Sequence, residues 1–244
     1  MAAGVQSCFA RYEKKYMLTR AQRDALLTRI SPYLRADRYP VYTICNLYYD
    51  TGDYRLIRAS LEKPVYKEKL RVRSYGVPGE ADSVFVELKK KFDGVIYKRR
   101  ITAELPLVEP FLAGLLDRDA FGQIGQEIEW FQRCNRTMPK VFIGYDREAF
   151  AGLDEPELRV TFDTRLRWRD TKLDLACGDH GRLLLPEDAV LMELKLPGGC
   201  PLWLSHALCE LSLYPTSFSK YGECYRTCLL PAMQQKRKEA AFCA

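Results

Sequence analysis

The sequence has few of the residues and motifs on which common catalytic sites depend. It contains two histidines, His180 and His206, so a histidine-based catalytic triad has few candidates. It has no Gly-x-x-x-x-Gly-Lys-Ser/Thr loop, no Gly-x-Ser-x-Gly elbow and no Gly-x-Gly-x-x-Gly turn. These absences argue against a P-loop nucleotide site, an α/β-hydrolase and a dinucleotide-binding fold.

The spacing of the cysteines does not indicate disulfide bonds or a zinc site. Nine of them are scattered along the chain, no two in Cys-x-x-Cys spacing. The odd number argues against a disulfide framework, and the histidines stand in no zinc-ligand spacing to the cysteines. We expect reduced, mostly packed thiols and a cytoplasmic location.

Long apolar runs and a strongly basic tail are also lacking. No apolar stretch approaches the roughly 20 residues needed to span a bilayer, and the chain does not open on a charged-then-apolar leader. The formal net charge of +6 is modest, and we interpret the basic run 236–238 as a solvated helix end. We therefore expect no membrane segment and no nucleic-acid partner; protein partners stay open.

Charged residues, by contrast, fall at every second position in several short segments. Alternate side chains of a β-strand point to opposite faces, so the charges of each segment share one face. The apolar residues between them would line a covered face. One sheet face is therefore predicted to be charged throughout. The segments are 11–15, 69–73, 87–89, 98–100, 159–163 and 193–195.

The predicted elements are mostly strands with helices inserted. We predict one α+β domain over 1–244, a closed antiparallel β-barrel of about eight strands with helices packed outside and at the C-terminus. A helix is expected over about 20–36, with Thr19 as N-cap and a kink or an end at Pro32. Further helices are expected over 106–135 in two pieces, over 201–213, and over 219–231 with Lys220 in its first turn. The candidate strands are 8–17, 41–49, 65–75, 83–91, 95–104, 140–148, 157–168, 171–176 and 189–196.

A pore lined by Lys and Arg with a few carboxylates suits a polyanion with its metal ion. Phosphoryl transfer spreads negative charge over the transferred group. Positioned cations and a metal can therefore supply most of the stabilisation without a histidine.

Several motifs, taken in order, resemble the VTC domain, the polyphosphate polymerase domain of the vacuolar transporter chaperone type, within the triphosphate tunnel metalloenzyme (CYTH-like) superfamily. The similarity runs from about residue 9 to residue 228. The motifs are Arg11-Tyr12-Glu13-Lys14-Lys15-Tyr16, Leu47-Tyr48-Tyr49-Asp50-Thr51, Leu70-Arg71-Val72-Arg73-Ser74-Tyr75-Gly76, Val86-Glu87-Leu88-Lys89, Tyr145-Asp146-Arg147, Arg159-Val160-Thr161-Phe162-Asp163, Met192-Glu193-Leu194-Lys195 and Phe218-Ser219-Lys220-Tyr221.

The resemblance implies an antiparallel tunnel that binds ATP, triphosphate and polyphosphate with a divalent metal, Mn²⁺ or Mg²⁺. It also implies a reaction that moves the γ-phosphate of ATP onto a growing polyphosphate chain and releases ADP. The basic residues that match the family's phosphate-binding positions are Lys15, Arg71, Arg73, Lys89, Lys98, Arg147, Arg159 and Lys220.

Glu193 matches the family's metal-binding glutamate, and Lys195 shares its strand face by alternation. An ion pair of Glu193 with Lys195 or with a cross-strand arginine is the alternative. Glu13 and Glu87 are weaker metal candidates that otherwise orient the arginines. The residues predicted to act in catalysis are Lys15, Arg71, Arg73, Lys89, Arg159 and Glu193.

Three functions are consistent with the same cations. The first is an ATP-dependent polyphosphate polymerase. The second is a metal-dependent hydrolase of tripolyphosphate or a nucleoside triphosphate, in which water attacks instead of phosphate. The third is a polyphosphate-binding module without catalysis. The shortage of acidic relative to basic residues on the predicted charged face favours the polymerase.

Overall fold

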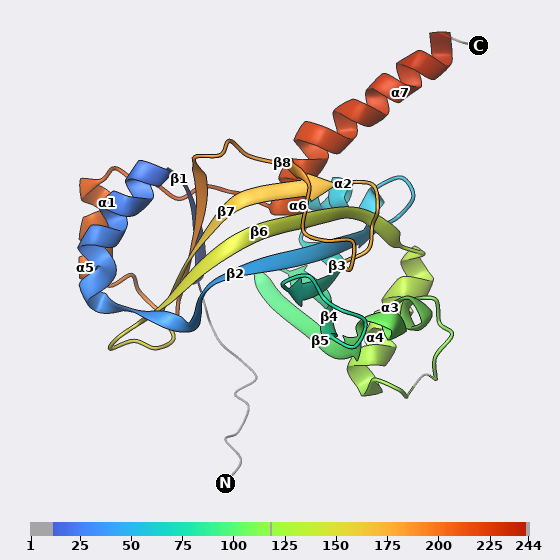
Figure 1. Ribbon diagram of the computed structural model, residues 1–244, viewed down its shortest axis with the longest axis horizontal. Helices are drawn as coiled ribbons and strands as arrows, with labels where there is room; N and C mark the ends of the chain where they lie inside the picture. Colours follow the sequence, from blue (N-terminus) through green and yellow to red (C-terminus); the bar gives the residue numbers. More distant parts are fainter. Residues whose placement is uncertain (1–11, 118, 243–244) are drawn as a thin grey trace. The chain divides into compact units, whose positions relative to one another are not determined.

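The computed structural model describes residues 12–117 and 119–242 and contains a large antiparallel sheet with attached helices (Figure 1). The strand order is β1-β9-β7-β6-β2-β3-β4-β5, and β8 pairs with β7. The strands are β1 (Tyr12–Thr19), β2 (Leu34–Asp50), β3 (Tyr66–Tyr75), β4 (Ser83–Phe92), β5 (Val95–Glu104), β6 (Met138–Gly152), β7 (Arg159–Arg169), β8 (Arg182–Leu183) and β9 (Ala189–Leu196).

Helices lie between the strands and follow the last of them, which confirms a mixed α and β fold built on an antiparallel sheet. Within residues 12–117 and 119–242, no pairing joins β5 to β1, so closure into a barrel stays a prediction. The helices are α1 (Arg20–Ile30), α2 (Arg55–Leu61), α3 (Leu105–Leu112), α4 (Gly122–Asn135), α5 (Leu202–Glu210), α6 (Lys220–Cys224) and α7 (Leu230–Phe242), with a 3₁₀ turn η1 (Ser31–Tyr33) and a π-helical turn η2 (Tyr225–Leu229).

The chain divides into two compact units, each drawn from three stretches of sequence. Unit 1 comprises Met1–Tyr42, Tyr145–Leu166 and Leu185–Phe218. Unit 2 comprises Thr43–Gly144, Arg167–Leu184 and Ser219–Ala244. The prediction that 1–244 form one domain stays a prediction.

Unit 1 has its own hydrophobic core, built by strand alternation. Tyr16 and Leu18 of β1 and even-numbered apolar residues of β7 and β9 pack in one core with apolar side chains of α1 and α5. Helices α1 and α5 lie side by side (Figure 1), and the rings of Tyr33 and Trp203 stack with centroids 4.6 Å apart. The covered strand face contains Tyr16, Leu18, Val160, Phe162, Val190, Met192, Leu194 and Leu196.

Unit 2 buries one face of its strands in the same way. Helices α3 and α4 contribute Phe111, Leu112, Ile128 and Phe131 to its core. The odd-numbered residues of β3 and β4, such as Arg71 and Glu87, lie on the face opposite this core, as the alternation predicts. The covered strand residues are Cys45, Leu47, Tyr49, Leu70, Val72, Val84, Val86, Leu88, Ile101 and Ala103.

The first helix begins as the sequence predicts and ends earlier. Thr19 caps α1 in a capping box, its side chain accepting from the Gln22 backbone N–H while the Gln22 side chain accepts from the Thr19 N–H. The expected bound near residue 36 is wrong, because β2 starts at Leu34. The α-helix ends at Ile30, and Pro32, where we expected a kink or an end, falls in η1. Proline cannot donate the backbone hydrogen bond that would continue the helix.

A strand predicted over 171–176 is also wrong. The guanidinium of Arg169 donates instead to backbone carbonyls in that loop, those of Lys172 (3.1 Å), Asp174 (2.8 Å), Gly178 (2.9 Å) and His180 (2.8 Å). Lys172 has a φ of 48°, a left-handed conformation outside the strand region. A side chain thus takes the carbonyls that a sheet ladder would have used.

The helices expected over 106–135 and 201–213 form as α3, α4 and α5. The helix expected over 219–231 begins at Lys220, as predicted, but continues through η2 and α7 to Phe242. No helix in 12–117 and 119–242 is long and apolar enough to cross a membrane. The expectation of mostly packed cysteines is wrong for the described thiols, since Cys134, Cys177, Cys200 and Cys209 are exposed.

Candidate functional site

The strand face of unit 2 opposite its core carries cross-strand rows of polar and charged side chains. The pairing of β2, β3, β4 and β5 sets these rows. Directly paired residues on one face lie close enough to interact. The rows are Asn46, Arg73, Phe85 and Thr102; Tyr48, Arg71, Glu87 and Arg100; and Lys69, Lys89 and Lys98.

Glu87 is the acidic centre of this face. Its carboxylate is 2.8 Å from Nη2 of Arg71, 2.8 Å from Nζ of Lys98 and 2.7 Å from Nε of Arg100, while Nε of Arg73 lies 3.8 Å away. Burial by itself raises the pKa of the Glu87 carboxyl, but Arg71, Arg73 and Lys98 lower that pKa more. The resulting pKa lies well below its ordinary value. Glu87 is therefore ionised and holds several cations in fixed positions.

Neutral side chains complete the support of the two arginines. Nε of Arg73 donates to Oδ1 of Asn46 at 3.0 Å, and Nδ2 of Asn46 donates to the Ile143 carbonyl. Nη1 of Arg71 donates to the Tyr48 hydroxyl at 3.4 Å. Each guanidinium is thus held from more than one side, which lowers the entropy cost of binding an anion.

The segment that begins α6 is held to the same unit by buried polar contacts. The Tyr221 hydroxyl donates to Oδ2 of Asp50 at 2.9 Å, and the Tyr221 ring stacks on Tyr48 at 4.8 Å. Asp50 is fully buried and also accepts from the backbone N–H groups of Leu56 and Ile57, at the start of α2. These contacts fix the position of Lys220, the neighbour of Tyr221 in the chain.

Ser219 links this segment to the charged rows. Its hydroxyl accepts from Nζ of Lys69 at 3.0 Å and from the backbone N–H of Gly222 at 3.2 Å, as the N-cap of α6. Ser219 and Lys220 are thereby placed in the same unit as Arg71, Arg73, Lys89 and Lys98.

Unit 1 carries a second charged strand face, opposite its own core. Strands β1, β9 and β7 are paired so that residues of like parity stand in line. Lys15 contacts Glu13 at 2.9 Å, Lys195 lies 3.9 Å from Glu193, and Arg159 contacts Asp37 of β2. The rows are Glu13, Lys195 and Arg159; and Lys15, Glu193 and Thr161.

Arg147 is the buried cation of this second face. Its guanidinium forms two hydrogen bonds with Asp163, at 2.6 and 2.8 Å, and approaches Oε2 of Glu193 at 3.7 Å. Burial lowers the pKa of Arg147, but Tyr145, Asp163 and Glu193 raise it more, so the net pKa lies well above its ordinary value. The guanidinium of Arg147 also forms a cation–π contact with Tyr145, with its carbon atom 5.3 Å from the ring centroid.

The predicted site residues thus form two sets. The set in unit 2 is Arg71, Arg73, Glu87, Lys89, Lys98 and Lys220. The set in unit 1 is Glu13, Lys15, Arg147, Arg159, Glu193 and Lys195. Within each unit, contacts or register bring most of the set together on one strand face. That both sets line one cavity stays a prediction, as do their roles.

Several residues of these faces were not predicted as site residues. Arg100 follows from strand alternation, because it lies two positions from Lys98. Asp163 follows in the same way, because it lies four positions from Arg159. Asn46 likewise stands two residues from Tyr48. Asp50 also stands two residues from Tyr48, but its contact with Tyr221 joins segments that are distant in sequence. Asp37 could not be found in this way, because its partner Arg159 is likewise distant in sequence.

A divalent metal fits Glu193 better than the other predicted carboxylates. Glu87 is occupied by Arg71, Lys98 and Arg100, and Glu13 is paired with Lys15. The cations nearest the Glu193 carboxylate, on Arg147 and Lys195, stand off at 3.7 and 3.9 Å. Among the described residues, no three Asp, Glu, His or Cys side chains are grouped to hold a metal. This donor set suits Mg²⁺ or a similar ion that takes most of its ligands from phosphate and water.

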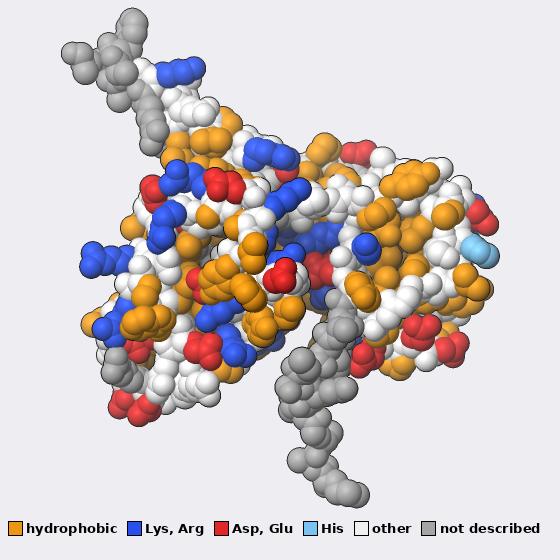
Figure 2. Space-filling model, turned by 180° about the vertical axis from the view of Figure 1, so that it is seen from behind, with side chains coloured by type: hydrophobic (Ala, Val, Ile, Leu, Met, Phe, Trp, Pro, Cys, Tyr) orange, Lys and Arg blue, Asp and Glu red, His pale blue; other side chains and the backbone are white. Residues whose placement is uncertain are grey.

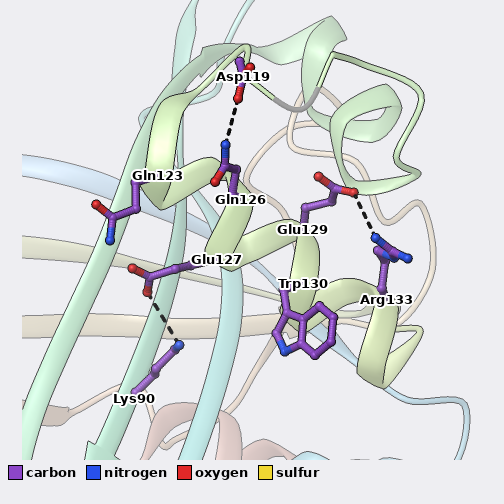
Figure 3. A pocket seen from close by; sticks show the side chains of 8 residues that line it. All are labelled: Lys90, Asp119, Gln123, Gln126, Glu127, Glu129, Trp130 and Arg133. Carbon is purple, nitrogen blue, oxygen red and sulfur yellow. Dashed lines mark hydrogen bonds and ion pairs between the residues drawn. The ribbon is translucent and has the colours of Figure 1, made fainter.

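A pocket of about 620 Å³ lies elsewhere in unit 2, along α4 (Figure 3). Lys90 of β4 contacts Glu127 there at 3.6 Å, and Trp130 is 66% exposed. None of the predicted site residues lines this pocket. Figure 2 shows basic and acidic side chains exposed together on one face of the molecule, in keeping with the modest net charge.

Solved structures share this fold at low sequence identity. A putative adenylate cyclase from Bacillus halodurans is 11% identical, with a TM-score of 0.51 over 85% of this chain and 92% of that chain. A putative adenylyl cyclase from Hippeastrum, described as having a dominant triphosphatase activity, is 16% identical, with a TM-score of 0.51 over 88% and 94%. At these identities the likeness defines the fold alone, which is of the CYTH-like class.

Within that class, the chain belongs to the VTC domain family, whose pattern matches residues 10–229. The resemblance drawn from the sequence motifs is thereby confirmed. A comparison with curated proteins gives no match.

Proposed function

We propose that this protein is an ATP-dependent polyphosphate polymerase, which transfers the γ-phosphate of ATP to a growing polyphosphate chain. Membership of the VTC domain family supports a function on polyphosphate or triphosphate. The observation that carries the proposal is the arrangement around Glu87, whose carboxylate holds Arg71, Lys98 and Arg100 in fixed positions. Preorganised cations of this kind stabilise the charge that develops in phosphoryl transfer.

In the proposed reaction, a terminal oxygen of the polyphosphate chain attacks the γ-phosphorus of ATP. The new P–O bond forms as the bond from the γ-phosphorus to the β,γ-bridging oxygen breaks, and ADP leaves with that electron pair. Arg71, Arg73, Lys89 and Lys98 would bind phosphoryl oxygens on the unit 2 face. On the unit 1 face, the residues that would do so are Lys15, Arg147, Arg159 and Lys195. Lys220 would bind phosphate at the start of α6.

Glu193 is the residue that would hold a divalent ion, Mn²⁺ or Mg²⁺. When bound, such an ion neutralises phosphate charge and orients the transferred group. Glu13 and Glu87 are assigned to orient Lys15 and Arg71, because both carboxylates already form short ion pairs.

The proposal requires both sets of residues to act on one bound phosphate chain, as they would if the sheet closes into a tunnel. This requirement can be tested by acetylating the lysines with and without tripolyphosphate and comparing which of them are modified. Tripolyphosphate should protect Lys15 and Lys195 of unit 1 together with Lys89 and Lys98 of unit 2, over the same concentration range. Protection of one set alone would contradict the shared site.

A tripolyphosphate or nucleoside triphosphate hydrolase is the second candidate, favoured by the triphosphatase activity ascribed to the Hippeastrum protein of the same fold. The few carboxylates on the charged faces favour the polymerase, because a hydrolase must also activate water. A module that only binds polyphosphate is the third.

The release of ADP and inorganic phosphate separates the three functions. A polymerase incubated with ATP and Mn²⁺ releases ADP with little inorganic phosphate. A hydrolase acting on ATP releases the two in equal amounts. A binding module releases neither product, although it binds tripolyphosphate.

A further inference from the structure

Thr161 on β7 has a buried hydroxyl without a hydrogen-bond partner. It is the only such side-chain atom found within residues 12–117 and 119–242, and the residue is 6% exposed. A buried hydroxyl left unsatisfied is destabilising, because it has lost its hydrogen bonds to water and gained none in the protein. Such exceptions in native proteins call for an explanation, and one explanation is a ligand.

The position of Thr161 points to what that ligand is. The residue pairs directly with Glu193, which pairs in turn with Lys15 on β1. Its neighbours Val160 and Phe162 lie in the core, so Thr161 belongs to the opposite, charged face. Arg159 and Asp163, two residues away on either side, share that face.

The charges around Thr161 are largely matched within the protein. Arg147 is paired with Asp163, and Arg159 contacts Asp37. The Thr161 hydroxyl has no such partner among the described residues. It can donate one hydrogen bond and accept others without adding charge to the row.

We propose that the Thr161 hydroxyl donates a hydrogen bond to a phosphoryl oxygen of the bound triphosphate or polyphosphate chain, beside Glu193. This inference rests on the proposed function, and it names Thr161 as a further ligand-binding residue of the same site. The basic side chains attract the phosphate groups all along the bound polyphosphate. A hydroxyl at a fixed position on the strand favours one placement of the phosphate oxygens over the others.

The test uses the purified full chain with sodium tripolyphosphate in EDTA, so that binding is measured without metal. Thr161→Val keeps the shape of the side chain and removes the hydroxyl, and Thr161→Ser keeps the hydroxyl. The matched control is Thr137→Val, because Thr137 is equally buried but its hydroxyl donates to Gln132.

We expect Thr161→Val to melt at the wild-type temperature or above, since it removes an unsatisfied group, and to bind tripolyphosphate about tenfold more weakly, a loss of about 1.4 kcal/mol. Thr161→Ser should bind like the wild type. Thr137→Val should melt lower and bind unchanged.

Wild-type affinity in Thr161→Val would overturn the inference while leaving the proposed function intact. So would a loss of binding seen only when Mn²⁺ is present, because the hydroxyl would then serve the metal's ligands. A fall in melting temperature matching that of Thr137→Val, with unchanged binding, would assign the hydroxyl a structural role. Failure of the wild type to bind tripolyphosphate would instead overturn the proposed function, and with it this inference.

Discussion

Arg147 and Asp163 form a bidentate ion pair, in which Nε lies 2.6 Å from Oδ1 and Nη2 lies 2.8 Å from Oδ2. Asp163 is fully buried, and Arg147 is 8% exposed. The pair sets the guanidinium 3.7 Å from Glu193, the predicted metal ligand. The electrostatic surroundings of Glu193 on β9 therefore depend on Asp163, which lies on the neighbouring strand β7.

Asp163→Asn should be strongly destabilising. The change leaves the buried Arg147 without its short ion pair, and breaking a buried pair from one side costs about 3–5 kcal/mol. Urea unfolding should show the loss as a lower midpoint. Glu210→Gln is the control, since Glu210 pairs with Arg29 at the surface and such pairs contribute little. Equal midpoints for the two variants would contradict the role given to Asp163.

Glu87 should make stability depend on pH in the acid range. Its folded pKa lies below its unfolded value, so its contribution is fully present above the unfolded pKa of about 4.3 and is lost as pH falls through the folded pKa. Glu87→Gln should therefore be much less stable than the wild type at neutral pH, and this difference should shrink on acidification. Urea unfolding at several pH values measures it. A difference that stays constant into the acid range would show that the charge of Glu87 is not what stabilises this face.

Arg73→Ala should weaken both binding and turnover, because a charge-assisted contact to phosphate is worth roughly 1.5–3 kcal/mol. Arg99→Ala is the matched control. Arg99 pairs with Leu88, a core residue of β4, and contacts Glu127 rather than Glu87. Titration with tripolyphosphate should show a weaker Kd for Arg73→Ala alone. Equal losses in the two variants would indicate attraction by overall charge.

Tyr221→Phe should loosen the start of α6. The phenylalanine keeps the stacking on Tyr48 but leaves the buried carboxylate of Asp50 with one hydrogen bond fewer. Hydrogen bonds to charged groups contribute about 1.5–3 kcal/mol. Hydrogen exchange should show faster exchange in 219–224 and 55–57 than in the wild type. Unchanged protection in both segments would mean that the Tyr221 to Asp50 contact does not position Lys220.

The alternation of charged residues was a sound guide to each strand face. It follows from local geometry, so Arg71 and Arg73, or Glu193 and Lys195, could be placed on one face from sequence alone. The structure bears this out: the residues between them, such as Val72 and Leu194, are core residues of the two units.

The pairing across strands could not be predicted in this way. That Glu87 faces Arg100, and Glu193 faces Thr161, depends on register between distant segments. The loop after β7 does not form the predicted strand, because backbone carbonyls within it accept hydrogen bonds from the side chain of Arg169. Such a competition is decided by tertiary contacts, which a local pattern does not contain.

The fate of the γ-phosphate of ATP tests the central claim most directly. Wild-type protein and Glu193→Gln are incubated with Mn²⁺ and ATP labelled at the γ-phosphate, and the products are separated by length on a gel. The wild type should place the label in phosphate chains longer than triphosphate. Glu193→Gln, which keeps its side-chain shape but loses the charge that would hold the ion, should form none while still binding tripolyphosphate without metal. Label recovered from the wild type only as inorganic phosphate would contradict a polymerase, and chains made equally well by Glu193→Gln would contradict the metal-binding role of Glu193.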